Sequence, residues 1–140
     1  MRDWNPLTKD ELEKMFKNSY VNARTGTGGG KLYSSYRKRG FSIEETKKKC
    51  NAKEFTITRD YIQEIWYNQK GKCDDSNIIM DTKYLWINQH SLAPSIDRID
   101  NNEGYIVGNI RIVLRGFNKF RGTMKINEWN DFKKQVNFMV

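Results

Sequence analysis

The spacing of apolar residues follows a helical period through the first half of the chain and a strand-like period after Gly71. Thr8 and Glu11 form a capping-box pattern ahead of one apolar stripe, and Thr58 precedes another. The glycine-rich stretch 24–30 is expected to form a loop between the first two helices. The first half thus predicts helices at residues 8–21, 31–39, a short stretch after Ser42, and 58–68.

Four short segments of the second half alternate or run apolar, which is typical of strands. A short helix over 116–121 follows them, and then a last helix from about Asn127. The last helix is expected to bury Trp129, Phe132 and Val136. The expected strands are residues 77–80, 84–87, 95–97 and 110–114. This mixture of helices and strands predicts the α+β class, and the whole chain is expected to form one domain because no repeat or linker divides it.

The composition narrows the class of protein. The chain has 140 residues, 37% of them hydrophobic, which is enough to form a core despite a net charge of +8. Its apolar runs are too short to cross a bilayer, so we expect no membrane partner. Its first residues lack the apolar region of a secretory signal peptide, so we expect a cytoplasmic location. The two cysteines, Cys50 and Cys73, cannot form a disulfide framework or a four-cysteine zinc site.

The charges are unevenly distributed along the chain. Residues 31–50 carry seven cations and two acids, and residues 111–125 carry five cations and no acid. Residues 73–103, between them, carry six acids and two cations. An acidic pocket with basic flanks suits an enzyme that holds a hard cation against a polyanion. The alternative is a mosaic of solvated faces with no functional meaning.

The segment from Ser95 to Gly122 contains the residues with the clearest chemical meaning. A strand is expected to end at Asp97, a second to open at Asn109, and the helix that follows carries Asn118. A hairpin followed by a helix can bring Asp97 and Asn118 together although 21 positions separate them. One carboxylate and one amide oxygen suit Mg²⁺, which takes few protein ligands and completes its shell with water and phosphate oxygens.

At these residues the chain resembles the HNH, or ββα-metal, endonucleases. The pattern D-R-I-D-x-x-x-G-Y-x-x-x-N-I-x-x-V is similar to a subset found in phage and bacterial HNH proteins and in a rare-cutting restriction enzyme. The resemblance covers residues 31–125. It leaves residues 1–30 as an N-terminal helical extension with the glycine-rich loop, and residues 126–140 as a C-terminal helix. The fold that it implies is a two-stranded hairpin plus helix, embedded in several flanking helices.

The resemblance also implies roles for individual residues. Asp97 and Asn118 would hold one Mg²⁺ or Mn²⁺ ion, and Asn109 would either fix the loop by hydrogen bonds to the backbone or contact the metal. Arg98 stands where most of the family has a general-base histidine, and because arginine is a poor base it would grip phosphate instead. The chain's one histidine, His90, is then the leading base candidate. Asp75, Asp100 and Glu103 are the next candidates for the general base.

Each of these roles has a plainer alternative. Asp97 could form a salt bridge with Arg98 or Arg111, Asn118 could be an ordinary amide on a helix surface, and His90 could be an ordinary surface histidine. Many relatives hold structural zinc with two Cys-x-x-Cys pairs, but here the first pair reads Cys73 to Ser76. No structural zinc is therefore expected. Aromatic packing is expected in its place, from Trp66, Trp86, Tyr105, Phe117 and Trp129.

The function expected from the resemblance is hydrolysis of phosphodiester bonds in double-stranded DNA, by in-line attack of water at a single metal ion. The alternatives are a catalytically inactive, HNH-derived DNA-binding module and, less favoured, an RNA-directed nuclease. The cell would be a bacterium or a phage-infected host, and a homodimer is one possible assembly. The residues expected to contact the DNA backbone are Lys31, Arg37, Lys38, Arg39, Arg111, Arg115, Lys119 and Arg121.

Overall fold

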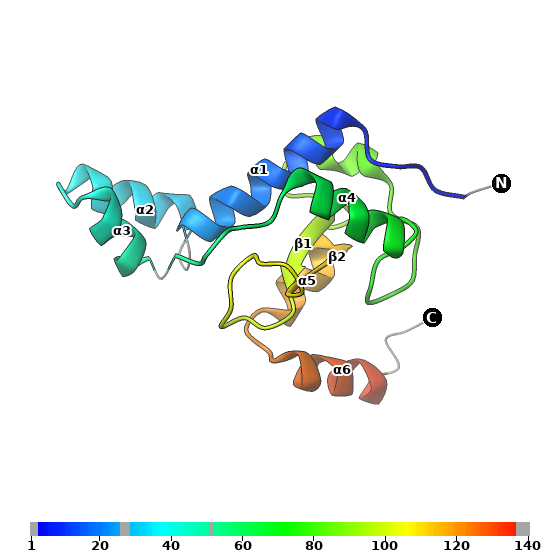
Figure 1. Cartoon of the computed structure of the whole chain (residues 1–140). Helices are drawn as coiled ribbons and strands as arrows, with labels where there is room; N and C mark the ends of the chain where they lie inside the picture. The colour runs from blue at the N-terminus through cyan, green and yellow to red at the C-terminus, as the bar shows by residue number, and fades with distance from the viewer. Residues whose placement is uncertain (1–2, 26–28, 51, 137–140) are drawn as a thin grey trace.

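The computed structural model describes residues 3–25, 29–50 and 52–136 and has an α+β fold (Figure 1). A two-stranded antiparallel hairpin lies between helices on both sides. The elements are, in chain order, α1 (Lys9–Thr25), α2 (Gly29–Lys38), α3 (Ile43–Lys49), α4 (Arg59–Asn68), the 3₁₀ helix η1 (Thr82–Trp86), β1 (Pro94–Arg98), β2 (Ile110–Leu114), α5 (Arg115–Arg121) and α6 (Ile126–Gln135).

The register of the hairpin separates an apolar face from a polar one. Ile96 lies opposite Ile112, and Asp97 lies opposite Arg111. Because successive side chains of a strand point to opposite faces, Ile96 and Ile112 share one face and Asp97 and Arg111 share the other. Asp97 and Arg111 are thereby directed toward the side from which α5 approaches.

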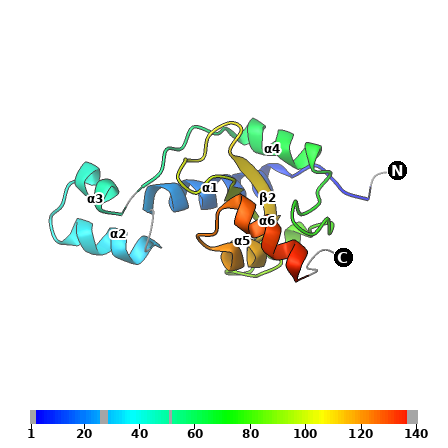
Figure 2. The same cartoon turned by 90° about the horizontal axis from the view of Figure 1, so that it is seen from below.

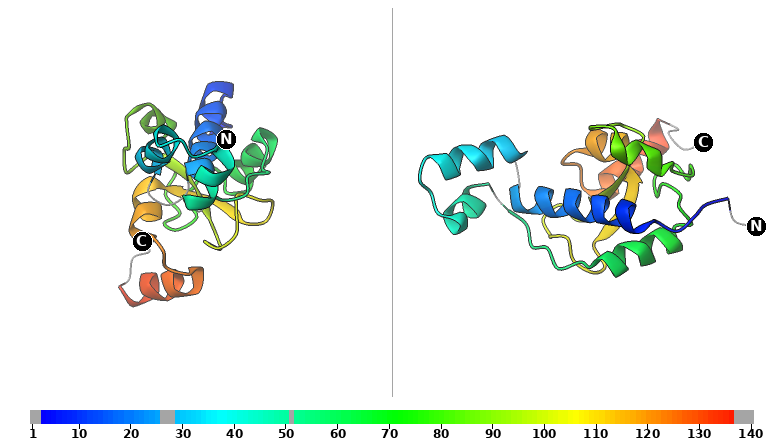
Figure 3. Two further views of the ribbon diagram at one scale, coloured as in Figure 1. Left: turned by 90° about the vertical axis from the view of Figure 1, so that its left-hand side faces the viewer. Right: turned by 90° about the horizontal axis from the view of Figure 1, so that it is seen from above.

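Helices α1 and α4 cover the apolar face of the hairpin, where the main core forms. Met15 of α1 and Ile62 and Trp66 of α4 are buried there with Ile96 and Ile112. The Trp66 indole donates a hydrogen bond to the carbonyl oxygen of a residue in the N-terminal segment at 2.7 Å. Helices α5 and α6 lie on the opposite side of the hairpin, as Figures 1 and 3 show.

Helices α2 and α3 form an arm that extends away from the rest of the molecule at the end of α1 (Figures 2 and 3). Ser42 begins α3 with a capping box, because its hydroxyl accepts from the Glu45 amide and the Glu45 carboxylate accepts from the Ser42 amide. Phe41, in the turn between the two helices, packs edge-on against Tyr36. Because α3 is only seven residues long, the cap and this aromatic contact help to stabilise it and the turn before it.

Several expected elements differ from the structure. The segment 84–87 falls largely within η1 instead of forming a strand, because Asp81 caps a tight turn through the Lys83 amide. Residues 77–80 form only an isolated bridge between Lys72 and Ile79. The expected loop at 24–30 is shorter than predicted, since α1 continues to Thr25 and α2 begins at Gly29; residues 26–28 lie outside the described part.

Two residues expected in the core are on the surface. Trp86 is 58% exposed and Val136 is 50% exposed, whereas Trp66, Tyr105 and Trp129 are buried as predicted. Trp86 is the last residue of η1, and Val136 follows the last turn of α6. None of the described helices combines the length and the apolar character that a membrane span requires.

Candidate functional site

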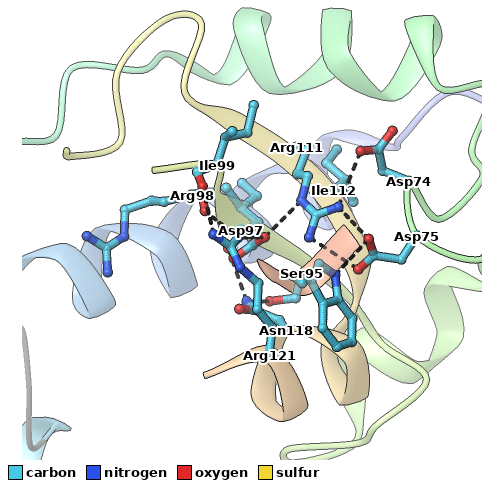
Figure 4. A network of polar contacts seen from close by, with 12 residues as sticks. Asp74, Asp75, Ser95, Asp97, Arg98, Ile99, Arg111, Ile112, Asn118 and Arg121 are labelled. Carbon is cyan, nitrogen blue, oxygen red and sulfur yellow. Dashed lines mark hydrogen bonds and ion pairs between the residues drawn. The ribbon is translucent and has the colours of Figure 1, made fainter. Parts of the chain in front are cut away.

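Asn118 of α5 lies against the polar face of β1, next to Asp97. Its side-chain nitrogen donates to Ser95 Oγ at 3.2 Å and to the Ile96 carbonyl at 3.5 Å. Ser95 and Asp97 are two positions apart on the strand and therefore share a face. The expected strand, strand, helix order thus places the aspartate and the asparagine in one cluster (Figure 4).

Asp97 is buried and paired with two arginines. Its Oδ2 atom lies 2.9 Å from Arg111 Nε and 2.7 Å from Arg121 Nη1. Asp97 as a whole is only 5% exposed. The cross-strand neighbour Arg111 and the α5 residue Arg121 approach from different sides (Figure 4). One of the plainer alternatives for Asp97, the salt bridge with Arg111, is therefore present in the structure.

Arg111 joins Asp97 to a second buried carboxylate, Asp75. Its Nη1 and Nη2 atoms donate to Asp75 at 2.5 and 3.2 Å, and Lys133 of α6 donates to the same carboxylate at 2.6 Å. The Trp129 indole completes the set at 3.0 Å. Burial raises the pKa of Asp75, but hydrogen bonds from Arg111 and Lys133 outweigh it, and its pKa lies below the usual value.

The same network raises the pKa of Arg111. Burial acts in the opposite direction, but the hydrogen bond and the charge of Asp75 overcome it, with Asp97 adding to the effect. Arg111 therefore stays charged inside the protein. Asp75 cannot act as the reserve general base, because its carboxylate is buried and engaged by Arg111, Lys133 and Trp129.

The expected contacts of Arg111 and Arg121 with DNA are wrong for this conformation. Arg111 is 6% exposed and Arg121 is 1% exposed. Besides Asp97, Arg121 donates to the carbonyls of Arg98 and Ile99 at 2.8 and 2.7 Å, and to that of Met124 at 2.9 Å. The Arg121 guanidinium holds α5 to the hairpin, and the Arg111 guanidinium joins Asp97 to Asp75. Neither group can reach a phosphate outside the protein in this position.

The other expected DNA contacts lie closer to the surface. Arg37, Lys38 and Arg39 at the end of α2 are exposed, and so is Lys119. Arg115, the first residue of α5, is half-buried. The side chain of Lys31 lies outside the described part of the structure.

Asn109 holds the connection between the two strands of the hairpin. Its Oδ1 accepts from the Asp100 amide at 2.8 Å, and its Nδ2 donates to the carbonyls of Asp100 and Gly104 at 3.1 and 2.8 Å. This is the set of contacts that the loop-fixing interpretation predicts. The neighbouring Asp100 accepts from the Asn102 amide at 2.9 Å, as a turn residue does.

Arg98 points away from the Asp97 and Asn118 cluster (Figure 4). Its Nη1 donates to the carbonyls of Asn101 and Glu103 at 2.8 and 3.0 Å, and its guanidinium lies 5.4 Å from the centre of the Tyr105 ring. The structure therefore places the Arg98 guanidinium against the loop that follows β1 and does not bring it to the pair that would hold a metal.

The hydrogen bond of His90 constrains what its ring can do. Its Nδ1 accepts the Leu92 amide proton at 3.0 Å, and the ring stacks on Tyr84 with centroids 4.3 Å apart. A neutral imidazole whose Nδ1 is an acceptor carries its proton on Nε2. His90 in this position is thus a hydrogen-bond donor through Nε2, and its basic nitrogen is already occupied.

Two contributors were absent from the expected site. Ser95 binds Asn118, and the strand alternation that pairs it with Asp97 on one face is a signal from which it could have been found. Lys133 anchors α6 to Asp75, but nothing in the local sequence pattern of this helix distinguishes Lys133 from the neighbouring lysine.

The Cys73–Ser76 turn is attached to the rest of the fold by hydrogen bonds and ion pairs. The backbone amide of Leu114 donates to Cys73 Sγ at 3.3 Å. Buried ion pairs of Asp75, in addition to aromatic packing, attach the Cys73–Ser76 turn to the fold.

A metal site here depends on the Asp97 and Asn118 pair. In the part of the chain that the structure describes, no group of three or more histidine, cysteine or acidic residues is arranged to hold an ion. A carboxylate and an amide oxygen are still the donor chemistry that Mg²⁺ accepts, with water supplying the rest. The scan against protein-family models and the searches of curated proteins and solved structures found no match.

Proposed function

We propose that this protein is a metal-dependent endonuclease of the HNH, or ββα-metal, type that hydrolyses phosphodiester bonds in double-stranded DNA. The observation that carries the proposal is the position of Asn118, which α5 places against β1 on the face that bears Asp97. An antiparallel hairpin followed by a helix, with these two oxygen donors on one face, is the arrangement that the resemblance implies. The loop fixed by Asn109 supports the same assignment.

In this proposal Asp97 and Asn118 hold one Mg²⁺ or Mn²⁺ ion. Both arginine pairs engage Asp97 Oδ2, so Oδ1 is the oxygen assigned to the ion. Asn118 donates through its nitrogen to β1, which leaves its Oδ1 as the second ligand. When bound, the ion would offset the negative charge that develops on the attacked phosphate. Arg111 and Arg121 would hold the Asp97 carboxylate in a fixed orientation.

Two observations favour a second candidate, a DNA-binding module without catalysis. The Asp97 carboxylate already has two cationic partners, and a divalent ion beside Arg111 and Arg121 would face their repulsion. In addition, Arg98 and His90 do not supply a general base at this pair. A module of this kind would shift DNA in a gel and leave its strands intact.

A plasmid-nicking assay with Mg²⁺ and with Mn²⁺ separates the two candidates. We expect the wild-type chain to relax supercoiled DNA, and Asn118→Ala to lose more than about 100-fold of that activity, since even changes to residues that only support a metal ligand cost about 10–100-fold. DNA retention in a gel should survive in this variant. Lys134→Gln, an exposed change on α6, is the matched control and should cut normally.

Asp97→Asn is a weaker test because it also removes a buried ion pair from Arg111 and Arg121. Its fold must be checked by circular dichroism before its activity is interpreted. Intact supercoiled DNA in the presence of wild-type protein and either metal, with a clear gel shift, would replace the nuclease proposal by the DNA-binding module. Normal cleavage by Asn118→Ala would refute the assigned metal site.

A further inference from the structure

A polar pocket of about 420 Å³ lies beside the hairpin, between α1, the outer edge of β1 and the segment after η1. Among the described residues that line it, Lys14 and Arg115 are cations and none is acidic. Side-chain amides from α1 and from residues 88–89 add further polar groups. A concave site with positive charge and no carboxylate favours an anionic ligand.

Two donors at this pocket are held in fixed positions. The stack on Tyr84 and the hydrogen bond from the Leu92 amide hold the His90 ring in place. Because Nδ1 accepts that hydrogen bond, Nε2–H is the group of the ring that can donate to a ligand. Arg115 Nη1 donates to the Gln89 carbonyl at 3.1 Å, which anchors the guanidinium beside the pocket. Donors that are already ordered lose little entropy when a ligand binds.

The remaining features of the pocket match a nucleotide. Trp86 is 58% exposed and lines it, and an exposed indole offers a stacking surface to a base. The volume is within the range of pockets for small ligands, roughly 300–1,000 Å³. Ser95, which binds Asn118, also lines the pocket, so the pocket adjoins the proposed metal pair.

We propose that this pocket binds one nucleotide of a DNA strand, with its phosphate on His90 Nε2–H and Arg115 and its base against Trp86. DNA as the source of the nucleotide rests on the proposed function. In this assignment His90 and Arg115 position the strand beside Asp97 and Asn118, and His90 donates to phosphate instead of accepting a proton from water. The nucleotide must leave the base stack of a duplex to enter, so single-stranded DNA should bind the pocket better than duplex DNA.

The single histidine of the chain makes the pocket observable by NMR, because its ring signals need no assignment among others. Titrations use thymidine 5′-monophosphate, thymidine, inorganic phosphate and a short oligothymidylate. We expect the His90 signals to shift with the monophosphate and the oligonucleotide, and thymidine to bind about tenfold more weakly, as removal of a charged hydrogen-bond partner implies. Unchanged His90 signals with all four probes would overturn the proposal. Equal affinity for inorganic phosphate and the monophosphate would overturn the assignment of a nucleotide.

Calorimetry on variants tests the two donors. His90→Phe keeps a ring against Tyr84 and removes the donor, and it should weaken monophosphate binding about tenfold. Arg115→Gln should do the same by an independent route, so the test does not depend on one variant folding. Lys17→Gln is the matched control, since Lys17 is an exposed lysine of α1 outside the pocket. Wild-type affinity in both pocket variants would refute the proposal.

The NMR and calorimetry results test the pocket, and the nicking assay tests the nuclease, so the two proposals can fail independently. DNA cleavage by wild-type protein with unchanged His90 signals removes the pocket and leaves the nuclease. Shifted His90 signals without cleavage remove the nuclease and leave a nucleotide-binding pocket on a DNA-binding module.

Discussion

At the scale of single residues, the buried charges converge on Asp75. Its carboxylate takes hydrogen bonds from Arg111, Lys133 and Trp129, which belong to β2 and α6. Removing one member of a buried ion-pair network leaves the other charges without compensation, and that cost exceeds the value of a single exposed pair. Asp75 is therefore the residue whose loss should destabilise the fold most clearly.

We expect Asp75→Asn to lower the free energy of unfolding by about 3–5 kcal/mol, because Lys133 would remain buried without its anion and Arg111 would lose one of its two buried carboxylate partners. Urea denaturation followed by tryptophan fluorescence measures the change. The neighbouring Asp74→Asn is the control: the Asp74 side chain is 49% exposed and lies 3.4 Å from Arg111, so its loss should cost about 1 kcal/mol or less. Equal effects of the two substitutions would show that the Asp75 network does not contribute as argued.

The same residue predicts a dependence of stability on pH. The pKa of Asp75 is lower in the folded protein than in the unfolded chain, so its contribution is complete above its unfolded pKa of about 3.9 and is lost as the pH falls below that value. The difference in unfolding free energy between wild type and Asp75→Asn should thus shrink steadily from about pH 5 toward about pH 2. Chemical denaturation at a series of pH values measures it, and a constant difference would contradict the assigned pKa direction.

At the scale of elements, the strand connection is fixed to the chain segment before α4. The Tyr105 amide donates to the Glu54 carbonyl at 2.7 Å, and the Thr56 amide donates to the Tyr105 carbonyl at 3.0 Å. Gly104 makes this close approach possible, because a Cβ atom there would lie 2.3 Å from the Glu54 carbonyl oxygen. Asn109 holds the same loop from the inside.

Gly104→Ala should therefore destabilise the protein by about 1–3 kcal/mol, since backbone atoms of Glu54 cannot move aside as a flexible side chain does. Thermal unfolding gives the stability, and hydrogen exchange at the Tyr105 amide reports the local junction. Asn102→Ala, an exposed change in the same loop, is the control and should exchange at the wild-type rate. An unchanged Tyr105 amide in Gly104→Ala would mean that the junction tolerates the added carbon.

The sequence predicts the elements whose signals are local. Thr8 and Glu11 cap the start of α1 and Thr58 caps α4, so short-range spacing located both helices. The apolar run at 84–87 misled the strand prediction because alternation alone does not distinguish a strand from the 3₁₀ turn that Asp81 caps. A salt bridge of Asp97 with Arg98 or Arg111 was expected only as an alternative, and the register of the hairpin places Arg111 opposite Asp97.

Burial of charge was beyond the sequence because the partners are distant along it. Arg121 pairs with Asp97 across 24 positions, and Arg111 pairs with Asp75 across 36. A run of cations without acids, as at 111–125, is typical of a solvated surface, and only the packing of α5 and α6 against the hairpin turns part of it inward.

At the scale of the whole molecule, the burial of Arg111 and Arg121 leaves the arm formed by α2 and α3 as a region with several exposed cations. Two of the five cations at 111–125 are enclosed, whereas Arg37, Lys38 and Arg39 are exposed. Lys48 of α3 is exposed as well. The arm extends from the end of α1, away from the hairpin (Figure 2). We expect it to contribute to DNA affinity without taking part in cleavage.

The double variant Lys38→Gln/Lys48→Gln tests this division. Removal of one lysine–phosphate ion pair should reduce the slope of log K against log salt by about 0.9, so the slope should fall by about 2 for both, while the cleavage rate at saturating DNA stays at the wild-type value. Fluorescence anisotropy over a range of salt concentrations gives the slope. Lys9→Gln/Lys134→Gln removes the same charge from exposed positions on α1 and α6 and is the matched control. Similar slopes in the two double variants would show that net charge, and not the arm, governs binding, because only a local interaction with phosphate distinguishes them.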